Sequence, residues 1–257
     1  PVPVLVIASF LGIPGERRND FKRWSNALVG RLDGQPVSPE QFADLVEMSE
    51  YFEEVVAQRI QRPGNDLISW IIAGSDDGGD PLTADDLVAF CTLLLVAGNE
   101  TTTNLLGNLF LAFWDHPDQY DKMRSAHDLR PVIEEALRYD GPAQGILRLT
   151  NTDLQLGDVQ IPEDNLVLIL FGSANRDELR WPDGHRFDAE RKPLDHLGFG
   201  SGIHMCLGAH LARLEATVAL DVLRKRVRTI QPRGKPERLL SPILRGVTSM
   251  PVDVEPI

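Results

Sequence analysis

Apolar residues recur every three or four positions through much of the first half of the chain, and proline or small polar residues interrupt this pattern at intervals. Such spacing places the apolar side chains on one face of a helix. The pattern predicts a short helix that begins near Pro3 and a second helix that begins near Pro14. The second helix collects its large apolar residues on one side: Phe21, Trp24 and Leu28.

Two more helices are predicted from their boundaries. Residues 38–41, Ser-Pro-Glu-Gln, form a capping-box pattern with proline at the first helical position, so a third helix should begin there. Pro63 ends that helix. A short helix is expected over residues 66–73, and the Asp- and Gly-rich residues 75–81 are expected to form a loop.

A long helix is predicted from residue 83 to about Trp114, where it would measure roughly 48 Å. It is apolar nearly all round, which is typical of a helix that crosses the centre of a fold. Its longest apolar run, residues 87–98, is shorter than the ~20 residues that a membrane-spanning helix requires. A buried core helix is therefore the better interpretation.

After Pro142 the period of the pattern changes from that of helices to that of strands. The predicted elements from the end of the long helix onward are helices over residues 117–125 and 131–139, strands over 147–150, 154–156, 159–161 and 166–171, a helix over 209–223, and strands and turns from 229. This order predicts a mainly α fold with a small β region, of the α+β class. Since no linker interrupts the pattern, residues 1–257 are expected to form one domain.

Composition and charge narrow the function classes. The chain has 257 residues, 42% hydrophobic and 25% charged, as in ordinary globular proteins. A net charge of -12 argues against a nucleic-acid partner and against docking on anionic membranes. Only two cysteines are present and no signal peptide is visible, so we expect a cytoplasmic protein without disulfides.

One cysteine, Cys206, lies in a glycine-punctuated loop over residues 199–208 and is followed by an apolar helical stretch. A cysteine at a helix N-terminus has a favoured thiolate, which is a good ligand for a soft metal centre. Two other interpretations are a small buried thiol and a zinc site that would recruit His196, His204 and His210. The other cysteine, Cys91, is expected in the core.

The centre of the long helix breaks the local rules. Residues 97–103, Ala-Gly-Asn-Glu-Thr-Thr-Thr, put an acid and three threonines where apolar residues are expected. Such exceptions concentrate at functional sites. The alternative is that the hydroxyls bond to the preceding turn and the acid to a distant base.

Further along the chain, Glu135 and Arg138 lie on one helix face, either as a surface pair or as part of a structural cluster. Arg148 lies within a predicted strand between two leucines, where a guanidinium needs an anion.

The cysteine loop resembles the haem-binding loop of the cytochrome P450 family, the haem-thiolate monooxygenases. Every fixed position of that family's loop is filled: Phe199, Gly200, Gly202, His204, Cys206 and Gly208. The resemblance implies that heme b (iron protoporphyrin IX) is the cofactor and that Cys206 is its metal ligand. The implied activity inserts one oxygen atom of O2 into a small apolar organic substrate.

The resemblance also implies roles for residues outside the loop. Gly98 would make room for dioxygen, Glu100 would relay protons, and Thr101 would hydrogen-bond the reacting oxygen. Arg148 and His204 would contact haem propionates. The implied substrate wall comprises Ala97, Ala143, Gly145 and Ile146. The implied structural cluster comprises Glu135, Arg138 and Arg191.

No flavin or nicotinamide fingerprint is visible in the chain, so electrons would come from a ferredoxin- or flavodoxin-type donor. The resemblance covers the whole chain but only the C-terminal portion of the family fold. This leaves an alternative function, a truncated and impaired haem-binding or haem-free remnant that acts as a binding or assembly module. Exposed core surface would then favour self-association or a completing segment.

Overall fold

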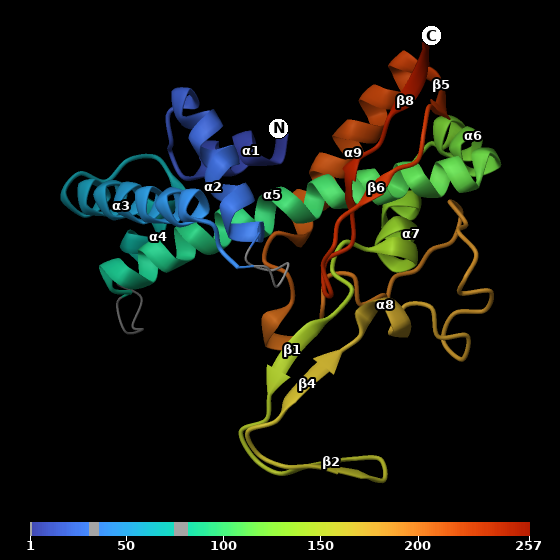
Figure 1. The fold of residues 1–257 in the computed structure, drawn as a ribbon. Helices are drawn as coiled ribbons and strands as arrows, with labels where there is room; N and C mark the ends of the chain where they lie inside the picture. Colours follow the sequence, from blue (N-terminus) through green and yellow to red (C-terminus); the bar gives the residue numbers. More distant parts are fainter. Residues whose placement is uncertain (1, 31–35, 75–81) are drawn as a thin grey trace. The chain divides into compact units, whose positions relative to one another are not determined.

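A computed structural model describes residues 2–30, 36–74 and 82–257. The backbone divides into two compact units, an N-terminal unit of residues 1–103 and a C-terminal unit of residues 104–257. The long helix α5 (Ala84–Asp115) contributes residues to both units (Figure 1). The loop predicted over residues 75–81 lies outside the described residues. The expectation of a single domain stays a prediction.

The N-terminal unit is built from helices. They are α1 (Val2–Phe10), α2 (Arg18–Gly30), α3 (Pro39–Gln61), α4 (Leu67–Gly74) and the first part of α5, with a 3-10 turn η1 (Gly15–Arg17) before α2. The predicted capping box at the start of α3 is confirmed, because the side chains of Ser38 and Gln41 each accept a hydrogen bond from the other's backbone N–H. Aromatic rings of α2 and α3, among them fully buried Phe21, Trp24 and Phe52, form the core between these helices.

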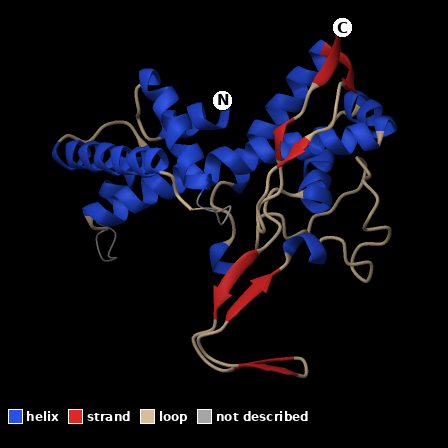
Figure 2. Cartoon of the chain, viewed as in Figure 1, coloured by secondary structure: helices blue, strands red, loops and turns tan. Residues whose placement is uncertain are grey.

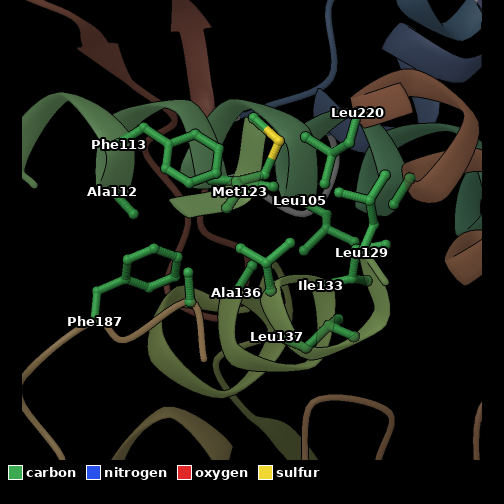
Figure 3. Packing of buried hydrophobic residues seen from close by; sticks show 14 of the residues in the cluster. Leu105, Ala112, Phe113, Met123, Leu129, Ile133, Ala136, Leu137, Phe187 and Leu220 are labelled. Atoms are coloured by element: carbon green, nitrogen blue, oxygen red, sulfur yellow. The ribbon is translucent and has the colours of Figure 1, made fainter. Parts of the chain in front are cut away.

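The C-terminal unit packs its helices around one apolar cluster. Besides the end of α5, these are α6 (Pro117–Ser125), α7 (Arg130–Asp140) and α9 (Ala209–Arg226). Figure 3 shows the cluster, in which Phe113, Met123, Ile133, Leu137 and Leu220 meet with almost no solvent exposure. Two short helical turns, α8 (Phe171–Ala174) and η3 (Gly202–His204), lie in the connections.

Within the described residues, the strands form four antiparallel pairs (Figure 2). The pairs are β1 (Ile146–Leu149) with β4 (Leu166–Ile169), β2 (Leu154–Leu156) with β3 (Val159–Ile161), β5 (Val227–Pro232) with β8 (Val252–Pro256), and β6 (Glu237–Arg238) with β7 (Val247–Ser249). The β2–β3 hairpin is therefore an excursion between the paired strands β1 and β4.

Thr150 closes the base of this excursion. Its backbone N–H donates to the carbonyl of Asn165 at 3.0 Å, and its hydroxyl oxygen accepts from the Asn165 N–H at 2.9 Å. The same hydroxyl donates to the carbonyl of Pro162 at 2.7 Å. The hairpin is thus fastened at its root, independently of the turn at its tip.

The predicted mainly α fold with a small β region is confirmed, with differences in the bounds of several elements. The second helix, α2, begins at Arg18 rather than near Pro14, because the 3-10 turn η1 precedes it. Strand β1 lies one residue earlier than predicted. Phe171, expected to end a strand, begins the helical turn α8. The last helix continues to Arg226, three residues beyond the prediction, because its basic end is favoured next to the carbonyls of a helix C-terminus. Within the described ranges, no helix is both long and apolar enough to cross a membrane.

Candidate active site

The cysteine loop folds back on itself just before α9. Gly200 and Gly202 have φ angles of +69° and +72°, a left-handed conformation that side chains with a Cβ rarely adopt. The backbone N–H of Cys206 donates to the carbonyl of Phe199 at 2.9 Å, so the two ends of the loop are joined. Gly208 then leads into the first turn of α9. The glycines of the motif therefore shape a compact loop that presents Cys206.

The two cysteines have different surroundings, and Cys91 lies in the core as the sequence predicted. Cys206 is exposed, whereas Cys91 is completely buried in α5. Burial raises the pKa of the Cys91 thiol to about 12, which makes it an inert core residue. At Cys206, desolvation by neighbouring protein atoms raises the pKa of the thiol, although the Gly208 N–H and the charge of Arg213 lower it. The expected preference for thiolate is therefore outweighed in the protein alone, and a metal ion at the sulfur would reverse the balance, since a coordinating thiol is deprotonated.

The surroundings of Cys206 suit a large apolar ligand. Ile203 and Leu207, on either side of it in the loop, are 97% and 77% exposed. Exposed apolar side chains beside a soft donor fit a flat, mostly apolar group such as haem. Among the residues that the structure describes, no three His, Cys, Asp or Glu side chains gather as a metal site, so the zinc interpretation finds no ligand set here.

Arg148 belongs to β1, and Ala143 and Gly145 lie in the segment that leads into this strand. Ala143 forms an isolated bridge with Leu244, and Gly145 lies against the carbonyl of Ile169 in β4. Arg148 donates only to the carbonyl of Leu147, at 3.0 Å, and forms no ion pair within the described ranges. Its guanidinium is therefore available for an anionic group, as the propionate prediction requires. His204 is exposed in η3.

In the N-terminal unit, the hydroxyl of Thr101 donates to the carbonyl of Ala97 at 2.6 Å. Ala97 is exposed, and with half-buried Thr101 it occupies one side of α5. The carboxylate of Glu100 lies 3.6 Å from the ammonium of Lys22 in α2 and 3.3 Å from the amide of Asn99. The acid in the helix thus has both a basic and an amide partner.

Gly98 lies where two helices of the N-terminal unit pack closely. A Cβ on Gly98 would lie 2.7 Å from the side chain of Ile7, so the glycine allows α1 to pack closely on α5. The role expected for Gly98 in the site, to leave room for dioxygen, stays a prediction. Ala97, the residue before Gly98, is exposed, and its carbonyl accepts the hydrogen bond from the Thr101 hydroxyl.

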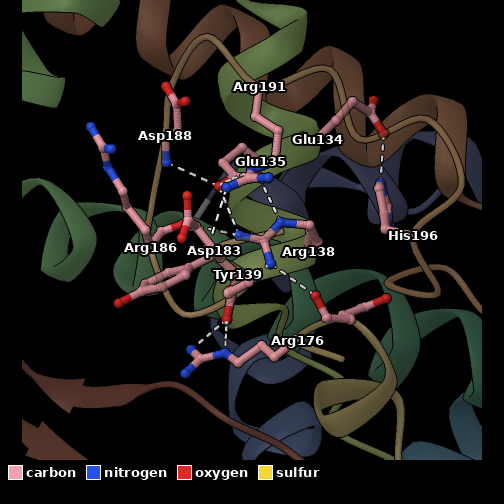
Figure 4. A network of polar contacts seen from close by, with 12 residues as sticks. Glu134, Glu135, Arg138, Tyr139, Arg176, Asp183, Arg186, Asp188, Arg191 and His196 are labelled. Carbon is pink, nitrogen blue, oxygen red and sulfur yellow. Dashed lines mark hydrogen bonds and ion pairs between the residues drawn. The ribbon is translucent and has the colours of Figure 1, made fainter. Parts of the chain in front are cut away.

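Glu135, Arg138 and Arg191 come together in the C-terminal unit (Figure 4). Arg138 donates to both carboxylate oxygens of Glu135 at 2.7 and 2.8 Å, and both side chains are fully buried. Arg191 approaches the same carboxylate at 3.3 Å. Arg138 also donates to the carbonyls of Asn175 and Gly184, so the cluster ties α7 to the segment that precedes the cysteine loop.

Comparison with known proteins identifies the family. A sequence profile described as "Cytochrome P450" matches residues 40–251. The chain belongs to the cytochrome P450 family. It is 42% identical over 258 residues to Cytochrome P450 107B1 of Saccharopolyspora erythraea, covering 98% of this chain and 62% of that protein. It is 37% identical over 258 residues to the cytochrome P450 monooxygenase PikC of Streptomyces venezuelae, covering 98% of this chain and 61% of that protein.

Solved cytochrome P450 structures share the fold. Cytochrome P450 CYP109Q5 from Chondromyces apiculatus matches with a TM-score of 0.91 and 43% identity, over 100% of this chain and 64% of that one. P450BioI, solved in complex with an acyl carrier protein carrying hexadec-9Z-enoic acid, matches with a TM-score of 0.91 and 34% identity, over 99% and 66% of the two chains. This P450 chain thus spans less than two thirds of the length of the two relatives from Saccharopolyspora erythraea and Streptomyces venezuelae.

The structure also brings together three residues that the sequence-based site predictions omit. Glu134, next to Glu135 on α7, binds both His196 and Arg213. The adjacent acids in the sequence of this P450 were a signal that α7 has two polar partners on different sides. His196 was considered only as a zinc ligand, and nothing in the sequence linked Arg213 to α7.

Proposed function

We propose that this chain is the haem-ligating portion of a monooxygenase that inserts one oxygen atom of O2 into an apolar organic substrate. Electrons would come from a separate ferredoxin- or flavodoxin-type donor. The observation that carries the proposal is the compact glycine loop that presents the exposed thiol of Cys206 at the start of α9. Family membership supports haem as the cofactor, and we propose heme b.

Cys206 would supply the thiolate that holds the haem iron, and Arg148 and His204 would hold the propionates. A haem held by a cysteine thiolate supplies the chemistry of oxygen activation and O–O bond cleavage. Glycines at positions 200 and 202 keep side chains away from the loop backbone, so a flat ligand can approach closely. Exposed Ile203 and Leu207 would then lose their contact with water, which stabilises the bound state.

Proton delivery would be carried by α5. Glu100 is 15% exposed and pairs with Lys22, which is 49% exposed, so its carboxylate can exchange protons with water beside α2. Because the Thr101 hydroxyl donates its hydrogen to the Ala97 carbonyl, its oxygen can accept a hydrogen bond from a protonated ligand. We propose that Glu100 supplies protons and that Thr101 orients them. Ala97, Ala143, Gly145 and Ile146 are proposed to contact substrate.

The test is the spectrum of the reduced protein with carbon monoxide, compared between the parent and a Cys206→Ser variant. The parent should show the red-shifted Soret band of a thiolate ligand. The variant should lose it, because a hydroxyl is a far poorer donor to a soft centre. A Cys91→Ser variant is the matched control and should keep the band. A red-shifted band that survives Cys206→Ser would overturn the assignment, and a parent without any Soret band would favour the haem-free module.

A further inference from the structure

A buried ionic network connects three separate segments to the beginning of the cysteine loop. Glu134 of α7 accepts two hydrogen bonds from Arg213 of α9, from Nε at 2.5 Å and from Nη2 at 2.9 Å. It accepts a third from the Nε2 of His196 at 2.8 Å (Figure 4). The side chains of Glu134 and His196 are 7% and 2% exposed, so these bonds are shielded from water.

His196 passes the connection to the loop backbone. Its Nδ1 accepts a hydrogen bond from the backbone N–H of Gly198 at 3.0 Å. The ring proton is therefore on Nε2, which donates the hydrogen bond to Glu134. One carboxylate thus fixes the orientation of the ring and, through it, the backbone immediately before Phe199.

Arg213 also contacts the side chain of Phe199. Its guanidinium carbon lies 4.5 Å from the centre of the Phe199 ring, within the range of a cation–π contact. Phe199 is also the residue whose carbonyl accepts the N–H of Cys206. The ring of Phe199 therefore contacts Arg213, which is bound to Glu134, and the carbonyl of Phe199 is bound to Cys206.

We propose that Glu134, His196 and Arg213 form a clamp that positions Phe199 and, through it, the sulfur of Cys206. These three are positioning residues, because none of them would touch the reacting atoms. Groups that orient a metal ligand commonly change metal affinity about 10–100-fold when they are mutated. The proposal rests on the haem-thiolate function proposed above, but its structural part concerns the loop itself.

The neighbouring cluster shows why the clamp is a separate device. Glu135, one residue along α7, binds Arg138 and Arg191 and accepts a hydrogen bond from the backbone N–H of Asp188. Within the described ranges, Glu135 forms no hydrogen bond with the cysteine loop. The two adjacent acids therefore anchor α7 to two different stretches of chain.

The test compares hydrogen–deuterium exchange and haem binding of the purified protein with Arg213→Lys and Glu134→Gln variants. Lysine keeps the positive charge but loses the two-bond fork and the flat contact with Phe199. Glutamine keeps the shape of Glu134 but removes the charge. In haem-free protein, both variants should exchange faster over residues 197–206 than the parent. Their haem dissociation constants should rise about 10–100-fold.

Arg224→Lys is the matched control. Arg224 is also on α9 and also binds a carboxylate, that of Asp221, through Nε and Nη2 at 2.9 and 2.7 Å, but it donates to the carbonyl of Ala126 rather than contacting the loop. This variant should exchange like the parent over residues 197–206 and bind haem equally well.

Three outcomes would overturn the clamp: unchanged exchange over residues 197–206, faster exchange spread equally over the whole chain, or an equal effect of Arg224→Lys. A parent that binds no haem would instead refute the proposed function, while the exchange measurement would still decide whether the clamp holds the loop.

Discussion

The hydroxyl of Thr101 donates its hydrogen atom to the carbonyl of Ala97 at 2.6 Å, so in this arrangement it does not donate to a ligand. As a donor to its own helix, it remains able to accept a hydrogen bond on its lone pairs. Thr101 is therefore suited to accept a hydrogen bond from a protonated group, and Glu100 is the nearest acid in the sequence.

Thr101→Ala should leave haem and substrate binding intact but uncouple electron use from product formation. The missing acceptor leaves the proton undirected, so more of the reducing equivalents should end as peroxide. Product formed per electron, with peroxide measured in parallel, checks this. Thr101→Ser, which keeps the hydroxyl, should behave like the parent, and equal coupling in the alanine variant would show that the hydroxyl serves only the helix.

Glu134 should make stability depend on pH. Burial raises the pKa of its carboxyl, but the bonds from His196 and Arg213 outweigh this and lower it from 4.5 to about 2. A lowered folded-state pKa contributes stability that is present above pH 4.5 and is lost as pH falls toward 2, about 3 kcal/mol in all. Urea unfolding at a series of pH values should therefore show the parent's advantage over Glu134→Gln shrinking through this window. An advantage that stays constant with pH would contradict the prediction.

Single residues also show where sequence reasoning stops. The cysteine loop was readable because its glycines and its cysteine follow one another in the chain. The clamp could not be predicted in this way, because Glu134 and Arg213 are 79 positions apart in the sequence. In addition, an acid or an arginine in a helix is most often solvated. The packing of α1 against Gly98 was not predicted for a related reason: the sequence does not reveal that Ile7 lies beside this glycine.

At the scale of elements, α7 is fastened by two buried carboxylates rather than by apolar contacts alone. Its predicted bounds were accurate because Pro131 marks the start and the apolar period ends near Pro142. Helix boundaries throughout the chain carry such signals, as the capping box of α3 does. The turn α8 carries none, since Phe171 follows directly on the apolar residues of a strand.

Removing one of the carboxylates of α7 should be costly. Glu135→Ala leaves the buried charge of Arg138 without its acid, a loss of roughly 3–5 kcal/mol of folding free energy. The variant should be insoluble or haem-free, which expression tests and absorbance spectra can measure. Glu190→Ala, which removes an exposed partner of Lys122, is the control and should change stability little. Normal melting of a haem-loaded Glu135→Ala protein would reduce the cluster to a minor contact.

At the scale of the whole molecule, apolar surface remains exposed on several elements. On α9, Leu214, Val218 and Val222 follow one another at helical spacing and are 60%, 55% and 45% exposed. In β4, Leu166 is 70% exposed. An exposed apolar stripe such as the one on α9 is typical of faces that are covered by another segment or another molecule.

The 257-residue chain produced alone should therefore run larger than a monomer on size-exclusion chromatography, and more so at higher concentration. Replacing Leu214 and Val218 by serine should shift it toward the monomer, because the stripe on α9 is interrupted. Replacing Leu240, which is 84% exposed but outside this stripe, is the control and should have less effect. Monomeric elution of the unmodified chain at every concentration would contradict the prediction.

The fastened root of the β2–β3 hairpin has a practical consequence. Because Thr150 and Asn165 hold the two arms together at their base, the turn between β2 and β3 can change length without moving β1 against β4. The tip, around Gly157, is therefore the place to graft an epitope or a fluorescent reporter. Such a label would follow the protein while leaving the register that carries Arg148 undisturbed.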